Sequence, residues 1–191
     1  WGVRGRLGVQ GCDLTLNYVQ EAEGALIPKQ RIGLTAKGDV GNLGVYGALG
    51  HYFDKGVESS TSLLLGADYS YNLDYNTKLT IQLEYLGLEL SSLAPQQREG
   101  LLKMKGSDKR LGLLIGRADY PIDDFSGISL MVLVNLYDGS MLISPSYRNT
   151  LAGDIDLTLG ASVFRGRENS LLSPGGSMPR AVLTVGLSYA F

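Results

Sequence analysis

The sequence contains few of the residues on which catalytic and metal-binding sites usually depend. Among its 191 residues there is one cysteine, Cys12, and one histidine, His51. A lone cysteine excludes an intramolecular disulfide framework and a cysteine-based metal cluster. A single histidine likewise excludes a histidine-rich metal centre, and no nucleophile motif such as G-x-S-x-G accompanies it. We therefore expect a protein that is not an enzyme and has no catalytic residues, no cofactor and no bound metal.

Long apolar runs and net charge are also scarce. The longest apolar stretch, around residues 128–136, spans about nine residues, whereas a membrane-spanning helix needs about 20. The formal net charge of −2 provides no strong field that would attract nucleic acid, so we expect no nucleic-acid partner. Glycine is abundant, with 26 residues, but only 6 prolines are present, which excludes a collagen-like chain.

The dominant pattern is an alternation of apolar and polar residues with a period of two, which indicates β-strands. In the last segment, Leu183, Val185 and Leu187 alternate with Thr184, Gly186 and Ser188. Such strands average about 5–6 residues in globular proteins, whereas a strand that crosses a bilayer needs about 9–11. Most of the segments here have the longer length. The pattern predicts eleven strands, over residues 1–9, 13–20, 30–38, 43–53, 60–71, 77–89, 109–119, 127–137, 140–149, 154–165 and 179–191.

The connections alternate between short turns and longer loops. Asp, Asn and Gly, which tolerate turn dihedral angles, are frequent in the short ones. Short periplasmic turns and long extracellular loops are the arrangement of bacterial outer-membrane barrels. An exception is Asp138-Gly139, a two-residue hairpin signal among the longer loops. The short turns are expected at residues 10–12, 39–42, 72–76, 121–126 and 149–153, and the longer loops at 21–29, 54–59, 90–108 and 166–178.

A soluble β-sandwich alternates in the same way and is the competing interpretation. However, the polar positions carry mostly Gly, Ser and Thr rather than the Lys and Glu of a solvated surface. Aromatic residues also gather near strand ends, as they do at the two interfaces of a membrane barrel. Those near the loops are Trp1, Tyr18, Phe53 and Tyr85, and those near the turns are Tyr69, Tyr71, Tyr147, Tyr189 and Phe191.

In the barrel interpretation, charged residues that alternate with the apolar face line the lumen. A charge on the lipid face near the bilayer midplane would cost about 2–4 kcal/mol. Arg117 and Asp119 break this rule, because they share parity with Leu111, Leu113 and Ile115; we expect them on the lipid face, where Arg117 reaches the interface. The strand at 43–53 has the least certain phase. The predicted lumen residues are Arg4, Arg6, Asp13, Arg31, Lys37, Asp68, Glu84, Arg110, Arg148 and Asp156.

The loop at 90–108 has more apolar surface than an exposed loop requires. Pro95 could start a short helix over residues 95–105, with Leu101, Leu102 and Met104 on it. This segment either folds into the pore as a constriction or forms an outer cap, and the sequence leaves both interpretations open. His51 is expected at the membrane interface, and Cys12 in a turn without a chemical role.

The end of the chain resembles the C-terminal assembly signal of bacterial outer-membrane barrels, which has a terminal aromatic residue preceded by hydrophobic residues at alternate positions. Phe191, Tyr189 and Leu187 match this pattern. Residues 68–71, 83–85, 137–140 and 144–146 also resemble the strands of large porin-like outer-membrane proteins of Gram-negative bacteria. The resemblance implies insertion into the outer membrane by the barrel assembly machinery, contact with outer-membrane lipid, and a role as a channel or a scaffold.

Eleven strands conflict with the even strand number of single-chain bacterial barrels. We therefore expect at least one earlier strand before Trp1. The rival count of ten joins residues 1–20 into one strand with a bulge at Gly11. Overall, we expect an all-β fold: an antiparallel transmembrane up-and-down β-barrel with about 10–12 visible strands, forming a single domain over residues 1–191 that can belong to a larger barrel.

Three functions fit this fold. The first is a porin-like channel in the bacterial outer membrane for passive passage of small solutes through a polar lumen. The alternative is a structural sheath that docks a periplasmic or extracellular partner, for example an electron carrier. An outer-membrane enzyme ranks third because the sequence shows no catalytic triad. Association into a homo-oligomer is compatible with either of the first two.

Deleting Phe191 is expected to lower the amount of folded protein in the outer membrane without changing its synthesis, because the deletion removes the terminal aromatic residue of the assembly signal. The measurement is the heat-modifiable band in the membrane fraction. Phe191→Tyr keeps a terminal aromatic residue and should assemble normally. An unchanged heat-modifiable band after the deletion would refute the role of Phe191.

Overall fold

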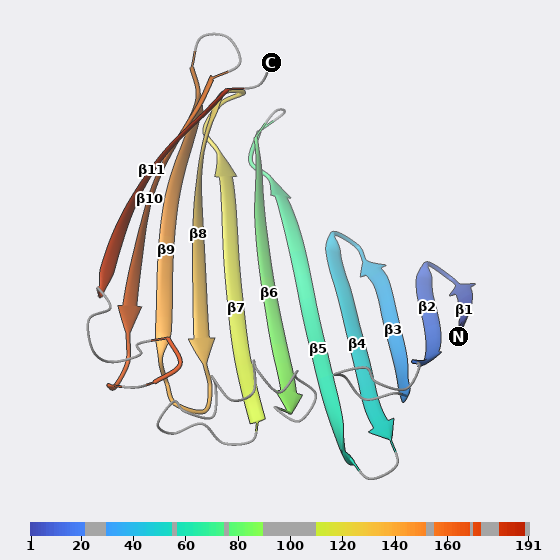
Figure 1. Cartoon of the computed structure of the whole chain (residues 1–191). Helices are drawn as coiled ribbons and strands as arrows, with labels where there is room; N and C mark the ends of the chain where they lie inside the picture. Colours follow the sequence, from blue (N-terminus) through green and yellow to red (C-terminus); the bar gives the residue numbers. More distant parts are fainter. Residues whose placement is uncertain are drawn as a thin grey trace.

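The computed structural model is one antiparallel sheet of eleven strands, in which each strand pairs with its neighbours in sequence (Figure 1). The structure describes residues 1–21, 30–54, 57–74, 77–89, 110–151, 155–168, 170–172 and 180–189. All eleven strands predicted from the alternation are present, with ends that differ by at most a few residues. They are β1 (Gly2–Val9), β2 (Cys12–Gln20), β3 (Gln30–Val40), β4 (Leu43–Asp54), β5 (Val57–Asn72), β6 (Lys78–Glu89), β7 (Arg110–Pro121), β8 (Ser126–Asn135), β9 (Met141–Thr150), β10 (Ile155–Arg165) and β11 (Ala181–Tyr189).

The first two strands form a hairpin, so the rival count of ten strands is wrong. β1 and β2 pair from Gly2↔Val19 to Val9↔Cys12. The two residues between them, Gln10 and Gly11, both have positive φ, at 46° and 83°. Two successive positive φ values are typical of the two-residue turns whose twist matches that of the flanking strands.

The antiparallel order places the short turns at one end of the sheet and the longer connections at the other, as the sequence predicted. We call these the turn end and the loop end. At the turn end, Asp123 fixes the β7–β8 connection, because its Oδ1 accepts hydrogen bonds from the backbone N–H groups of Phe125 (2.8 Å) and Ser126 (2.6 Å). The bonds from Phe125 and then Ser126 lower the pKa of the Asp123 carboxyl, so it remains charged at neutral pH.

The two faces of the sheet differ sharply in chemistry. The apolar face carries the alternating Leu, Val, Ile and aromatic residues, and the polar face carries most of the charges and hydroxyls. Among strand residues, every large hydrophobic side chain that is exposed lies on the apolar face except Met131 and Val182. The edge strand β11 shows the extreme: Leu183 is 83% exposed. Exposed large hydrophobic residues occur on nine of the eleven strands, which is more apolar surface than soluble monomers usually leave exposed.

This sheet has no conventional hydrophobic interior in its described part. The only side chains described as fully buried there are the small ones of Ser60 and Ser140. Within the same residues, no helix is long and apolar enough to span a membrane. The aromatic residues predicted near strand ends that lie in the described strands are on the apolar face. At the loop end, the rings of Trp1 and Tyr18 are 5.2 Å apart. The stability of the sheet therefore depends on backbone pairing and on whatever covers the apolar face.

Spin labels at Leu159 and Thr158 are expected to report opposite environments, because these neighbours face opposite sides of β10. The native Cys12 is first changed to Ser, and each label is attached to a single introduced cysteine in membrane-inserted protein. We expect high accessibility to oxygen at 159 and high accessibility to a water-soluble nickel complex at 158. The reverse pattern would contradict the assignment of the faces.

Candidate functional site

The polar face is the candidate functional surface, because it brings together most of the charged residues singled out in the sequence. The strand register places nine of the ten predicted lumen residues on it: Arg4, Arg6, Asp13, Arg31, Lys37, Asp68, Glu84, Arg148 and Asp156. The register also settles the phase of β4, whose Tyr46 and Tyr52 lie on the polar face.

The expected placement of Arg110 is wrong, and so is that of Arg117 and Asp119. Arg110 pairs with Glu89 on the apolar face, where its Nε lies 3.6 Å from Glu89 Oε1. Arg117 and Asp119 lie on the polar face instead, opposite Gln82 and Thr80. The alternation of Leu111, Leu113 and Ile115 predicts the wrong apolar side for this strand, because β7 has aliphatic residues on both faces.

The charges of the polar face form close ion pairs along or between strands. Arg6 Nη2 lies 2.8 Å from Asp13 Oδ2 across the first hairpin, and Arg31 Nη2 is 2.8 Å from Glu21 Oε1. Asp119 receives two hydrogen bonds from Arg117, of 2.7 and 2.9 Å. Such two-point contacts between a guanidinium and a carboxylate fix both groups in direction as well as distance.

Arg148 and Asp156 form a further pair near the turn end. Arg148 Nη2 donates to Asp156 Oδ2 at 2.5 Å, and the Thr150 hydroxyl donates to Asp156 Oδ1 at 2.6 Å. The Arg148 side chain is 65% exposed, whereas that of Asp156 is 27% exposed. The Arg117–Asp119 pair shows the same asymmetry, at 56% and 36%. In both pairs the arginine side chain is therefore more exposed than the carboxylate side chain that it contacts.

Tyr46 is the centre of a polar cluster that the sequence analysis did not single out. Its hydroxyl donates to Glu84 Oε1 at 2.5 Å and accepts from Gln82 Nε2 at 2.9 Å. The ring of Tyr46 lies over Gly66, its cross-strand partner, so closely that a Cβ at position 66 would be 2.2 Å from Tyr46 Cε2. A tyrosine opposite a strand glycine was the available signal, but finding it requires the strand register.

A hydroxyl-rich hollow of about 530 Å³ lies on the polar face at the turn end of β7–β10. Ser129 and Ser146, which line it, form a hydrogen bond of 2.6 Å, and Ser144 and Ser162 form another of 3.0 Å one row further from the turns. The charged residues lining the hollow have both signs: Arg117, Arg148, Asp119, Asp123 and Asp124. The mixture suits small polar solutes in general and does not define a site for one ion.

Toward the loop end the polar face becomes apolar in its middle strands. The side chains there are half-buried rather than exposed. The sequence pattern does not predict this apolar section of the polar face, because the pattern gives each strand one polar and one apolar side along its whole length. The residues concerned are Leu64, Leu86, Leu88, Leu111, Leu113, Ile115, Leu133 and Leu142.

The β8–β9 connection at the loop end is held by Asp138. The carboxylate accepts hydrogen bonds from Ser140 N (2.8 Å), Ser140 Oγ (2.5 Å) and Leu171 N (2.7 Å). Burial alone would raise the pKa of Asp138, but the bonds from Leu171 and Ser140 outweigh it and lower the pKa. The ionised carboxylate therefore ties residues 138–140 to the connection that follows β10.

Two further residues singled out in the sequence are His51 and Cys12. His51 lies on the apolar face near the loop end, where its Nδ1 is 3.1 Å from Thr61 Oγ1 and its ring is 5.8 Å from that of Phe53. Cys12 is exposed beside the first turn. Across the described ranges, no group of three or more His, Cys, Asp or Glu residues could hold a metal ion. The whole loop at 90–108 and Phe191 lie outside the described residues.

Comparison with known proteins finds similarity in structure but not in sequence. No protein-family model matches the chain, and no curated protein matches it. Among solved structures, the chain is similar to an anion-selective porin from Comamonas acidovorans, with a TM-score of 0.59 and 15% sequence identity. The match covers 99% of this chain and 55% of the porin, so the chain spans about half of that protein's length. At this identity the similarity concerns the fold: a porin-like sheet of up-and-down antiparallel strands.

Gly66→Ala is expected to lower the free energy of unfolding by about 1–3 kcal/mol, because the new Cβ would displace the Tyr46 ring and its hydrogen bonds. Gly33→Ala is the matched control on the same face: a Cβ there would meet only the Leu49 carbonyl oxygen, at 3.9 Å. Its effect should stay within about 0.5 kcal/mol. The measurement is urea unfolding in lipid vesicles, followed by heat-modifiable migration. An equally large loss from Gly66→Ala in a Tyr46→Ala background would show that the ring is not the cause.

Proposed function

We propose that the chain forms part of the wall of a passive channel through a bacterial outer membrane, with the apolar face in contact with lipid and the polar face toward an aqueous lumen. One observation carries this proposal: the exposed hydrophobic strand residues are segregated on one face, while nearly all charged strand residues are on the other. The porin-like fold supports it independently. A soluble sandwich would instead bury its apolar face against a second sheet, and the described strands all belong to one sheet.

The polar face has the properties that a water-filled path requires. Four of its arginines form ion pairs whose side chains remain partly exposed, so water and solutes can reach them. Pore diameter and wall charges then decide which solutes pass, and no chemical step is required. The polar Tyr46 cluster and the serine rows provide hydrogen-bonding groups along this wall without a deep ligand pocket.

A modest preference for anions follows from the ion pairs. Basic and acidic residues are nearly balanced on the polar face, so their numbers alone decide little. The side chains of Arg117 and Arg148 are more exposed than those of the carboxylates they pair with. A passing ion therefore meets positive charge first, which raises the local concentration of anions. The structurally similar porin is described as anion-selective, which agrees with this direction.

Membrane insertion would use the C-terminal signal. Leu187 and Tyr189 lie on the apolar face of the edge strand and are 71% and 63% exposed. Together with Phe191 they would present an apolar edge to the barrel assembly machinery. In the described sheet β11 is an edge strand that pairs with β10.

Arg148→Gln is expected to shift selectivity toward cations, whereas Arg110→Gln should leave it unchanged. The two arginines form a matched pair: both side chains are 65% exposed and both contact a carboxylate, but they lie on opposite faces. The measurement is the reversal potential of single channels in a salt gradient, made on the membrane-inserted full-length protein. The shift should shrink at high salt, because the Debye length falls from about 10 Å at 0.1 M to about 3 Å at 1 M.

Equal shifts from both substitutions would contradict the assignment of the polar face to the lumen. Absence of conductance from protein that has inserted into the bilayer would reject the channel and favour a sheath that docks a partner.

A further inference from the structure

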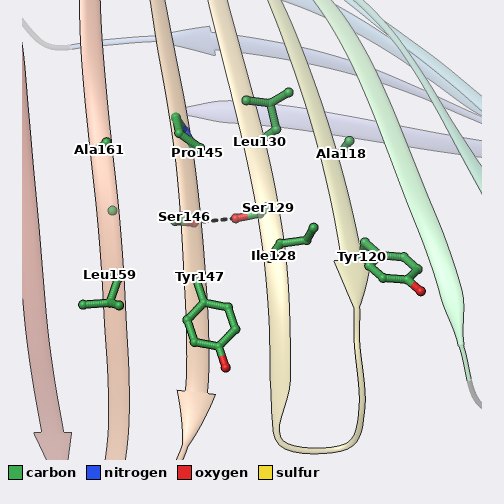
Figure 2. A pocket seen from close by; sticks show the side chains of 11 residues that line it. Ala118, Tyr120, Ile128, Ser129, Leu130, Pro145, Ser146, Tyr147, Leu159 and Ala161 are labelled. Atoms are coloured by element: carbon green, nitrogen blue, oxygen red, sulfur yellow. Dashed lines mark hydrogen bonds between the residues drawn. The ribbon is translucent and has the colours of Figure 1, made fainter.

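We propose that the apolar face carries a binding slot for one acyl chain of a phospholipid from the membrane leaflet at the turn end. The proposal rests on the membrane location proposed above and adds a specific ligand site to it. The slot is a hollow of about 570 Å³ on β7–β10 (Figure 2). Its walls include Ala118, Tyr120, Ile128, Tyr147, Leu159 and Ala161, which lie on four neighbouring strands.

The slot arises from small residues beside large ones in two rows of the apolar face. The row nearer the turns is Tyr120–Ile128–Tyr147–Leu159, which consists of large side chains on four neighbouring strands. In the next row, Ala118 pairs with Leu130, and Leu130 pairs with Pro145. Ala118 at one side of this row and Ala161 at the other leave the space unfilled, as Figure 2 shows.

Pro145 also interrupts the backbone pairing beneath the slot. The β9–β10 pairing runs from Asp156↔Thr150 to Gly160↔Ser146 and resumes only at Val163↔Ile143. Proline has no backbone N–H to donate to the ladder. The gap therefore lies at Ala161, where the second row of the slot ends.

The polar groups of the slot lie at one end only. The hydroxyls of Tyr120 and Tyr147 point toward the turn end (Figure 2), and Asn149 Nδ2 donates to the Tyr147 hydroxyl at 3.2 Å. Ser129 and Ser146 point to the opposite face, where they bond to each other. No lining residue is charged. This polarity matches a lipid whose headgroup lies at the tyrosine hydroxyls and whose chain extends toward the middle of the sheet, since tyrosines favour the membrane interface.

The size and surroundings of the slot favour a lipid chain over a second copy of the protein. Eleven residues line the slot, whereas a stable protein interface takes about 20–30 residues on each side. The slot is also continuous with the exposed apolar face, because Ile128, Leu130 and Leu159 on its walls are 48%, 43% and 41% exposed. An acyl chain already present in that surface can enter the hollow without removing any charged group from water.

The test fills the slot and counts the lipid that stays bound. Wild-type protein and the double variant Ala118→Leu/Ala161→Leu are inserted into vesicles of palmitoyl-oleoyl phosphatidylethanolamine and phosphatidylglycerol, extracted in mild detergent and examined by native mass spectrometry. Ala67→Leu is the control, because Ala67 also lies on the apolar face but outside the slot. We expect one retained phospholipid on wild type and on the control, and about tenfold weaker retention on the double variant, as expected when roughly two methylene contacts are lost.

The outcomes for the acyl-chain slot can be distinguished from those for the proposed channel. Equal retention by all three proteins, or no retained lipid on wild type, would overturn the slot. A dimer that disappears in the double variant would show that a second copy occupies the hollow instead, and would also overturn it. Vesicle flotation and single-channel recording on the same samples test the proposed function separately: failure to float or conduct would reject the membrane channel, whereas floating, conducting protein without a retained lipid would reject only the slot.

Discussion

Backbone hydrogen bonding is the constraint on which the rest of this structure depends. The strands satisfy their N–H and C=O groups by pairing with the strands next to them in sequence, and this pairing extends from β1 to β11, the two edge strands of the described sheet. In a hydrocarbon environment an unsatisfied backbone group costs several kcal/mol, so strands can cross a membrane only in such a paired arrangement. Once pairing fixes the register, the side chains have no freedom to choose a face. The separation into an apolar and a polar face is then a direct result of the alternating sequence.

The same constraint explains why the polar face is assembled from neighbours. Ion pairs such as Arg6–Asp13 and Arg148–Asp156 join residues that the register brings to adjacent positions. Tyr46 can contact Glu84 two strands away because Gly66 on the intervening strand has no side chain. Backbone pairing has a local exception beside Pro145, where the pairing of β9 with β10 is interrupted. This interruption coincides with the hollow on the apolar face. The Tyr46 cluster on the polar face and the hollow on the apolar face therefore both lie where a side chain is unusually small or where backbone pairing is interrupted.

The fold was predictable from the sequence because its main signal is local. A two-residue period identifies each strand without knowledge of its neighbours, and Gly11 with the Asp- and Asn-rich turns marks most of the ends. The face assignments failed in β7, where Leu111, Leu113 and Ile115 share the polar face with Arg117 and Asp119. Local hydropathy cannot show which side of such a strand faces lipid, since both sides are apolar. The Tyr46 cluster and the acyl-chain slot depend on three or four strands at once, so no single segment of sequence contains their signal.

The neighbour-to-neighbour strand order also bears on how the sheet forms. Every strand from β2 onward pairs with the one made just before it, so the contacts between strands join segments that follow one another in the chain. Closing a short connection costs little chain entropy, and the cost rises only slowly with length. The connection between Glu89 and Arg110 is the longest between two successive strands, so β6–β7 is the hairpin whose closure loses the most entropy. A chain of this topology can grow by adding one hairpin at a time to an existing edge, with a low contact order for an all-β protein. The two parts on either side of that connection, β1–β6 and β7–β11, are the natural units in which such growth would begin.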